Sequence, residues 1–209
     1  MANLALNGSS LTISQLVEAA RNPDTKVSIA PEAIPGIQRA ASAVQKLIHE
    51  GRIAYGITTG FGAFKDRLIP PEDVEKLQEN IILSHAVGTG PELPAEVVRA
   101  MMIIRTNTLA KGHSGIRLET LQLMLSLLNK NILPVIPSRG SLGASGDLAP
   151  LAHMALPLIG QGEVRFQGQV RPSAEVLQEH GLKPIKLSAK EGLAPVSYTH
   201  LTLPTNREV

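Results

Sequence analysis

Three consecutive residues, Ala144, Ser145 and Gly146, have the types needed to build a reactive ring from the backbone itself. If the amide nitrogen of Gly146 attacks the carbonyl carbon of Ala144 and Ser145 then loses its hydroxyl group as water, the product is a five-membered imidazolone with an exposed methylidene carbon. Glycine has no Cβ and therefore permits the close backbone approach that this attack needs. Asp147 follows directly and adds a carboxylate. The segment therefore predicts an electrophilic group that forms without an added cofactor.

Further motifs surround this triplet and lie at defined positions before it. They are GSLGASGDLAPL at residues 140–151, YGITTGFG at 55–62, LSHAVG at 83–88, RTN at 105–107 and KGHSG at 111–115. Together they resemble the aromatic amino acid ammonia-lyases, the family of the histidine and phenylalanine ammonia-lyases, and within it the histidine-specific members most closely. The resemblance covers residues 1–194 and implies an N-terminal fragment, because members of the family are much longer.

The resemblance implies a mechanism. The family carries a 4-methylidene-imidazol-5-one (MIO), here formed from Ala144, Ser145 and Gly146, which takes electron density from the substrate amine so that ammonia can leave; this is covalent catalysis by a group made from backbone. Tyr55 matches the catalytic tyrosine that removes the β-proton as a general base, a role that requires a pKa well below the free value of about 10. The glycines of the same loop, including Gly62, would let it approach the substrate closely.

His85 is expected to recognise the substrate. The Ser84-His85 pair is similar to the histidine-specific members, and an imidazole at residue 85 can hydrogen-bond a substrate imidazole, whereas phenylalanine-specific members carry apolar or aromatic residues there. Without the resemblance, a single histidine near a helix end is more often a cap or a satisfied surface residue, and a lone tyrosine such as Tyr55 is more often half-buried beside a turn. The resemblance favours the functional interpretation of both.

Other polar residues near the motifs keep two interpretations. Asp147 either assists ring closure or caps the helix that follows, because aspartate is favoured near helix N-termini on electrostatic grounds alone. For Arg105, Asn107, His113 and Arg117, a structural role in pairs and networks is favoured over support of a pocket. None of these four residues is assigned a catalytic role.

The spacing of the motifs disfavours other kinds of site. The run 143–146 is not a G-x-S-x-G nucleophile elbow, because glycine comes one place after the serine instead of two. A dinucleotide-binding fingerprint G-x-G-x-x-G that starts at Gly60 and Gly62 needs its third glycine at residue 65, where this chain has lysine. No Walker A lysine is present. The six histidines lack an HExxH-like spacing and the chain has no cysteine, so we expect neither a metal nor a nucleotide.

Composition is typical of a soluble globular protein. With 209 residues, of which 43% are hydrophobic, the chain can bury a core, and the absence of cysteine fits the cytoplasm. Residues 1–10 lack the features of a secretory signal, and no apolar run reaches the roughly eighteen residues of a membrane span. A net charge of +2 without a basic stripe, together with 2% aromatic residues, disfavours nucleic-acid binding.

Apolar periodicity predicts a mainly α fold with a small β-hairpin, and the resemblance implies that this is the N-terminal part of the ammonia-lyase (fumarase/aspartase-like) helical fold. The run 12–15 is a capping box that opens a helix. The apolar face expected for this helix consists of Ile13, Leu16, Val17 and Ala20. Further helices are predicted at residues 36–50, 71–84, 94–111, 115–129, 148–159 and 173–180. The hairpin is predicted from residues 163–166 and a second run near 169–170.

These elements are expected to position the ring-forming loop. Residues 133–137 must be extended, because a residue before proline is pushed out of the helical region, and they deliver the chain to the loop. The helix at 148–159 has Pro150 in its first turn, where a missing N–H costs nothing. Ser145 is therefore expected at a helix N-terminus, which favours developing negative charge.

The last fifteen residues, PVSYTHLTLPTNREV at 195–209, depart from the family pattern. In the family, the equivalent of residues 190–194 continues into an Asn-Gly-Thr-Gln motif, which is absent here. The segment resembles a translated cloning or sequencing adapter, and the alternative is an ordinary divergent C-terminus. We therefore expect an ammonia-lyase domain at residues 1–194 and a non-native or disordered tail at 195–209.

The expected function is the non-oxidative deamination of L-histidine to urocanate and ammonia, a carbon–nitrogen lyase reaction of histidine catabolism. The resemblance implies a homotetramer with sites built from several subunits, and no nucleic-acid or membrane partner. Because later pocket residues are missing, the fragment alone is expected to have little activity and to close the ring inefficiently. The alternatives are a phenylalanine or tyrosine ammonia-lyase, an aminomutase, and a non-catalytic helical scaffold.

Overall fold

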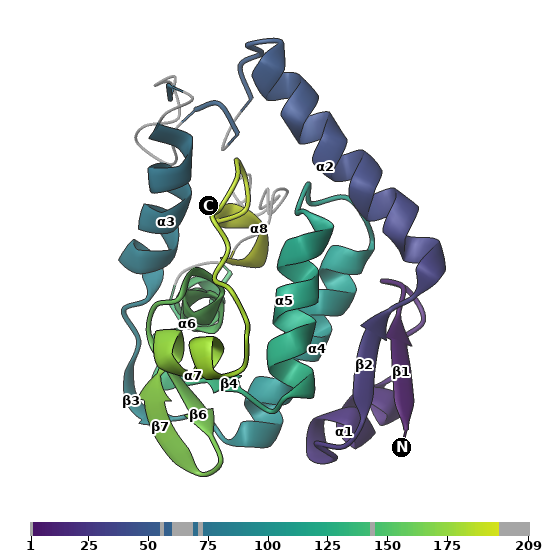
Figure 1. The fold of residues 1–209 in the computed structure, drawn as a ribbon, viewed down its shortest axis with the longest axis vertical. Coiled ribbons are helices and arrows are strands. Elements are labelled where there is room, and N and C mark those ends of the chain that lie inside the picture. The colour runs from purple at the N-terminus through teal and green to yellow at the C-terminus, as the bar shows by residue number, and fades with distance from the viewer. Residues whose placement is uncertain (1, 55–56, 60–68, 71–72, 143–144, 197–209) are drawn as a thin grey trace, which may run out of the picture.

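The computed structural model describes residues 2–54, 57–59, 69–70, 73–142 and 145–196. Helices predominate in these ranges (Figure 1), so the predicted mainly α class is confirmed. Three residues expected in the site, Tyr55, Gly62 and Ala144, lie outside the described residues. The same holds for residues 197–209 of the expected tail.

The N-terminal unit is a strand, a helix and a second strand. Strands β1 (Asn3–Leu6) and β2 (Lys26–Ile29) pair in parallel, and α1 (Ile13–Arg21) connects them. The predicted capping box is confirmed, since the backbone N–H of Gln15 donates to Thr12 Oγ1 at 3.3 Å and that of Thr12 donates to Gln15 Oε1 at 3.0 Å.

The expected apolar face of α1 is confirmed in part, since Ala20 is buried and Leu16 is half-buried against the core. Ile13 and Val17 are 81% and 40% exposed, whereas the helix buries Ala19 and Ala20. The side chain of Arg99, which lies on the neighbouring helix α4 (Ala95–Ala110), donates to the carbonyl oxygens of both alanines. The small side chains of Ala19 and Ala20 leave room for that guanidinium, which holds this side of α1 against its neighbour.

The longer helices follow the predicted periodicity. They are α2 (Ile34–His49), α3 (Val74–His85), α4 (Ala95–Ala110) and α5 (Leu118–Asn129), and a 3₁₀ turn at Pro31–Ala33 leads into α2. Each overlaps its predicted range and differs by a few residues at the ends. No helix in the described ranges is long and apolar enough to cross a membrane.

Helices α4 and α5 lie side by side at the centre of the structure (Figure 1) and carry much of the core. Met102 and Ile103 of α4 and Leu121, Leu127 and Leu128 of α5 are at most 1% exposed. Burial of a side chain of this size stabilises the fold by about 1.5–3 kcal/mol. The two helices therefore form a rigid base for the surrounding segments.

Short strands join the helices in the second half of the chain. Strand β3 (Thr89–Glu92) pairs with β5 (Pro137–Arg139), and β4 (Leu133–Pro134) pairs with β6 (Glu163–Phe166), which pairs with β7 (Gln169–Pro172), all antiparallel. The predicted hairpin is confirmed, and both of its turn residues, Gln167 and Gly168, have the positive φ angles of a primed turn.

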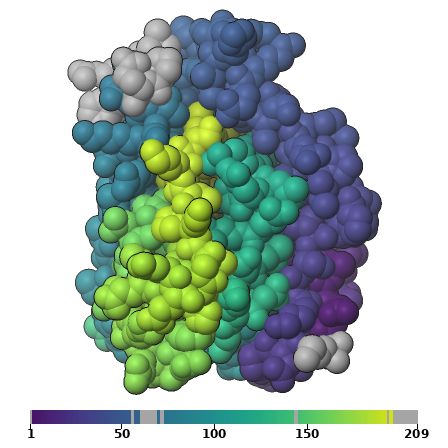
Figure 2. Space-filling view, viewed as in Figure 1, coloured from purple at the N-terminus to yellow at the C-terminus, as the bar shows by residue number. Residues whose placement is uncertain are grey.

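Three further helices complete the described part. They are α6 (Leu148–Ala155), which continues into a 3₁₀ turn at Leu156–Ile159, α7 (Ser173–Glu179) and the short α8 (Leu193–Val196). After α7 the chain turns back and runs between α3 and α5 toward α8, and Figure 2 shows it as a yellow band between its neighbours. This returning segment brings residues 186–194 into the middle of the helices.

Candidate active site

The end of the predicted ring-forming loop lies at the start of α6, as expected. Asp147 occupies the N-cap position, and its carbonyl oxygen accepts a hydrogen bond from the Leu151 N–H at 2.9 Å. The Ser145 Oγ accepts from the Asp147 N–H at 3.4 Å. The Asp147 side chain makes no capping hydrogen bond. Ser145 therefore lies where the helix N-terminus favours negative charge.

Gly146 fits the requirement of the ring for glycine. Its φ angle is +71°, a left-handed conformation that other residues rarely adopt. A Cβ at this position would lie 2.8 Å from the Ser141 Oγ, a side-chain tip that can rotate away, so the backbone conformation and not lack of space favours glycine. Of the triplet expected to form the MIO group, the structure describes Ser145 and Gly146, and the φ angle of Gly146 is one that glycine adopts without strain.

A hollow of about 240 Å³ lies beside Asp147, between α4 and α6. It is lined by Met101, Ile104, Arg105, Thr108, Asp147, Pro150 and Leu151. Most of these side chains are apolar, so the carboxylate of Asp147 stands at the edge of a largely apolar surface. Arg105 is 5% exposed and donates a hydrogen bond to the carbonyl oxygen of Ala194.

His85 is the last residue of α3 and is half-buried. Its Nδ1 lies 2.8 Å from the carbonyl oxygen of Ile81 and 3.1 Å from the Ser84 Oγ. A carbonyl oxygen can only accept, so the short contact to Ile81 assigns the proton to Nδ1. In that tautomer Nε2 is the acceptor of the ring, and it can receive a hydrogen bond from an N–H group of a ligand.

The segment after His85 is attached to α6 by a side chain that the sequence did not single out. The Nε2 of His153 accepts a hydrogen bond from the Gly88 N–H at 2.9 Å. Burial lowers the pKa of His153, which keeps its imidazole neutral and able to accept. A signal was present, because His153 is the one polar side chain in the apolar run 148–159.

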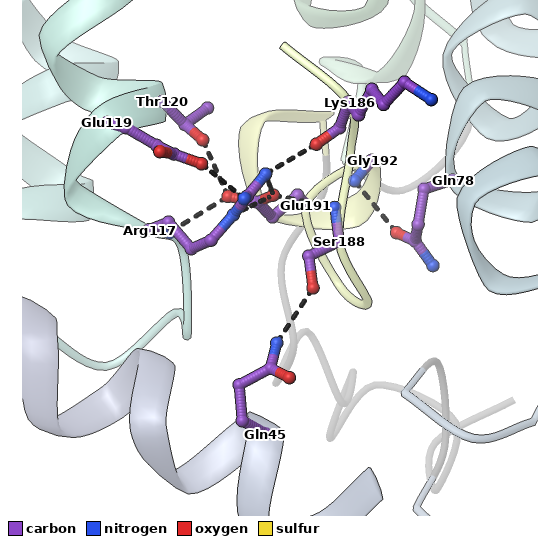
Figure 3. A network of polar contacts seen from close by, with 9 residues as sticks. All are labelled: Gln45, Gln78, Arg117, Glu119, Thr120, Lys186, Ser188, Glu191 and Gly192. Atoms are coloured by element: carbon purple, nitrogen blue, oxygen red, sulfur yellow. Dashed lines mark hydrogen bonds and ion pairs between the residues drawn. The ribbon is translucent and has the colours of Figure 1, made fainter. Parts of the chain in front are cut away.

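A second polar cluster centres on Glu191, which is fully buried (Figure 3). Its Oε1 accepts hydrogen bonds from the Arg117 backbone N–H at 3.0 Å and the Thr120 hydroxyl at 2.7 Å. Its Oε2 accepts from Arg117 Nε at 2.7 Å and from the Ser188 N–H at 2.8 Å. Burial alone would lower the pKa of Arg117, but the hydrogen bond and charge of Glu191 and the charge of Glu119 outweigh it and raise the pKa.

This cluster fixes residues 186–194 among the helices. Further contacts are Gln45 of α2 with Ser188, Gln78 of α3 with Gly192, and Arg105 of α4 with Ala194. Lys190, in the same segment, is 8% exposed and has a φ angle of +70°. Burial lowers its pKa.

The four polar residues for which a structural role was favoured lie as follows. Arg105 and Arg117 hold the 186–194 segment, and Asn107 Oδ1 accepts a hydrogen bond from the Gly8 N–H at 2.9 Å. His113 is exposed. Within the described ranges no group of three or more histidine, aspartate or glutamate side chains is arranged to hold a metal ion.

Comparison with known proteins identifies relatives. The family model of the aromatic amino acid lyases matches residues 11–205. Histidine ammonia-lyase of Chloroflexus aurantiacus is 59% identical over 191 residues, which are 90% of this chain and 36% of that protein. Histidine ammonia-lyase of Shewanella oneidensis is 51% identical over 197 residues, which are 94% and 38%. The chain thus spans little more than a third of the length of these relatives.

Solved structures show the same fold. Histidine ammonia-lyase of Trypanosoma cruzi superposes with a TM-score of 0.85 at 39% identity, covering 93% of this chain and 37% of that one. Ergothionase of Treponema denticola, an ergothioneine-degrading enzyme, superposes with a TM-score of 0.89 at 34% identity, covering 93% and 39%. From the family match and the two close relatives, we conclude that the chain belongs to the aromatic amino acid lyase family.

Proposed function

We propose that this chain is the part of an ammonia-lyase that carries the MIO loop, and that its substrate is L-histidine, converted to urocanate and ammonia. The observation that carries the proposal is the loop at the start of α6, where Gly146 has the left-handed conformation that glycine adopts readily and Ser145 lies at the helix N-terminus. The identity of 59% to a histidine ammonia-lyase supports the choice of substrate.

The ring would form from Ala144, Ser145 and Gly146, and once formed it supplies an electrophilic carbon for the substrate amine. Ser145 lies at the N-terminal end of α6, where the helix dipole stabilises negative charge. For Asp147 we favour assistance in ring closure over helix capping, because its side chain makes no capping hydrogen bond. A carboxylate beside the loop can accept a proton during cyclisation and return it to the leaving water.

His85 would select the substrate. With its proton on Nδ1, the ring accepts a hydrogen bond at Nε2, and an imidazole N–H of L-histidine is a suitable donor. Phenylalanine has no such donor in its side chain. Accordingly, replacement of His85 by leucine is expected to reduce use of L-histidine and to favour an apolar side chain.

Tyr55 is proposed as the base that removes the β-proton, and Gly62 as part of the loop that lets Tyr55 approach the substrate. A tyrosine can act in this way near neutral pH only if its pKa falls well below about 10. Replacement of Tyr55 by phenylalanine keeps the ring shape and removes the proton acceptor. We expect that change to abolish deamination while leaving ring closure at Ser145 intact.

The proposal also covers the domain limits of this chain and the assembly of the complete enzyme. We propose residues 1–194 as the lyase domain and 195–209 as a tail, and a cytoplasmic homotetramer for the complete enzyme. Exposed apolar side chains near the site, Val87 at 67% and Leu142 at 86%, support coverage by another part of such an assembly.

Peptide mass spectrometry tests the proposal directly. Ring closure removes two water molecules, so the peptide over residues 140–151 loses their combined mass, and Ser145→Ala serves as the control that cannot form the alkene. An unmodified mass in an intact relative that carries this loop would contradict the proposal. Release of the unsaturated acid is then measured for three substrates, as urocanate from L-histidine, cinnamate from L-phenylalanine and coumarate from L-tyrosine, and a β-amino acid product would indicate an aminomutase instead. For this chain alone we expect little urocanate and incomplete ring closure.

A further inference from the structure

Two segments with proposed roles in the reaction are joined by one hydrogen bond. Helix α6 begins directly after Ser145 and Gly146, and His153 lies on its second turn. The Nε2 of His153 accepts a hydrogen bond from the backbone N–H of Gly88 at 2.9 Å. Gly88 follows His85 by three residues, in a stretch between α3 and β3 that has no regular structure. The bond therefore ties the substrate-recognising segment to the helix that carries the loop.

The two segments approach so closely that there is little room for adjustment. A Cβ at Gly88 would lie 3.1 Å from His153 Nε2 and 3.2 Å from the carbonyl oxygen of Arg139. A Cβ at Gly140, the first residue of the loop motif, would lie 3.1 Å from the Gly88 Cα and 3.2 Å from the Cβ of Ala149. Backbone from three segments thus meets at one point, and a shift of Gly88 would carry His85 with it.

The imidazole of His153 supplies the acceptor that the partly buried N–H of Gly88 needs. The N–H of Gly88 is partly buried and needs an acceptor, and loss of a partner for such a group is costly. The adjacent residue, Val87, is 67% exposed and contributes little packing of its own. The hydrogen bond from Gly88 is therefore well suited to fix this stretch against α6.

We propose that His153 is a positioning residue, which holds residues 84–88 against α6 so that His85 stays at a fixed separation from Ser145. The inference rests on the proposed function, because it takes His85 as the residue that recognises an imidazole-bearing amino acid. His153 acts through the Gly88 N–H and does not itself contact the substrate.

Hydrogen exchange tests the hydrogen bond without any need for activity. His153→Phe keeps a planar ring without an acceptor, and we expect exchange of the Gly88 amide to accelerate about tenfold or more. His153→Gln presents an amide oxygen close to the position of Nε2 and should restore slow exchange. His180→Phe is the matched control, since His180 packs edge-to-face against Phe166 in a different part of the chain. Unchanged exchange in His153→Phe, or equal acceleration in His153→Gln, would overturn the proposal.

Binding of L-histidine tests the role of positioning. His153→Phe is expected to weaken binding about tenfold in the wild-type background, with no further effect when His85→Ala is already present, because coupled residues are not additive. Gly88→Ala places a Cβ against His153 Nε2 and the Arg139 carbonyl oxygen and so pushes the same two segments apart. This variant should behave like His153→Phe. If His153→Phe weakened the binding of L-histidine equally in the wild-type and His85→Ala backgrounds, His153 would have a structural role that does not act through His85. These binding measurements use an intact enzyme that contains this segment, because later pocket residues are missing from the present chain. If that wild-type enzyme binds no L-histidine, the proposed substrate is wrong, and the positioning role fails even where the exchange result stands.

Discussion

Replacement of the buried Glu191 by alanine is expected to destabilise this protein more than loss of any surface charge. The change removes the acceptor of four hydrogen bonds, which come from the Arg117 backbone N–H, Arg117 Nε, the Thr120 hydroxyl and the Ser188 N–H. Two of these donors are backbone groups that have been withdrawn from water. Without Glu191, the Ser188 N–H loses its link to the start of α5.

The size of the effect follows from burial. Removal of one partner of a buried ion pair typically costs about 3–5 kcal/mol, and Glu191 is fully buried. Glu191→Gln keeps Oε1 for Arg117 N–H and Thr120 but turns an NH₂ group toward the other two donors. Each donor left without an acceptor costs about 1–3 kcal/mol, so with two such donors we expect Glu191→Gln to lose about 2–6 kcal/mol.

Glu119 provides a matched control on the same guanidinium. It forms an ion pair with Arg117, but its side chain is 56% exposed, and such surface pairs contribute about 0–1 kcal/mol. The chain has no tryptophan, so urea unfolding is best followed by far-ultraviolet circular dichroism. If Glu191→Ala and Glu119→Gln had free energies of unfolding within about 1 kcal/mol of each other, the argument from burial would be refuted.

Three further predictions concern buried cations and an imidazole. Lys190→Met should raise the free energy of unfolding at pH 7, because burial lowers the pKa of Lys190, and the gain should vanish above about pH 10.4, where the unfolded chain is also neutral. Burial also lowers the pKa of His153, so wild-type stability should fall as the pH drops below about 6.5, where only the unfolded state takes up the proton; in His153→Gln this loss should be smaller. Arg99→Lys should cost about 2–4 kcal/mol in urea unfolding, because Arg99 donates to the Ala19, Ala20 and Leu128 carbonyl oxygens from a position that is 2% exposed.

The helices could be predicted because their signals are local. The capping box at Thr12, the apolar repeats of α4 and α5 and the turn at Gln167 and Gly168 each act over a few residues, and the structure confirms all of them. The parallel pairing of β1 with β2 was not predicted. Each strand has only four residues. The pairing joins Asn3–Leu6 to Lys26–Ile29, with a helix between them in the chain, and no local sequence pattern indicates a contact over that separation.

Strand β3 was missed for a different reason. Its residues, Thr89–Glu92, are all exposed and include a glycine and a proline, so neither alternation nor propensity indicates a strand. It pairs with β5 because the neighbouring residues Gly88 and Gly140 bring the two backbones together. The tertiary contact, and not the strand sequence, determines the conformation.

The candidate site was predicted in part. The types and spacing of Ser145, Gly146 and Asp147 indicated a loop at a helix N-terminus, and the structure has that loop. His153 stood out as the one polar side chain in the apolar run 148–159, but its role was missed because its partner is a backbone N–H, and a sequence pattern does not identify such a partner. Glu191 was missed because its partners lie more than seventy residues away along the chain, apart from Ser188.

Buried polar side chains gather around residues 186–194 for a physical reason. A buried segment with little regular structure has backbone groups that no helix or strand ladder satisfies, and each needs a partner to avoid a penalty of desolvation. Side chains from the surrounding helices supply those partners in this protein. The pairs are Arg117 with the Lys186 carbonyl oxygen, Glu191 with the Ser188 N–H, Gln78 with the Gly192 N–H and Arg105 with the Ala194 carbonyl oxygen. Arg105 and Arg117 are therefore explained by the irregular backbone that they hold, which is why a structural role suits them better than a catalytic one.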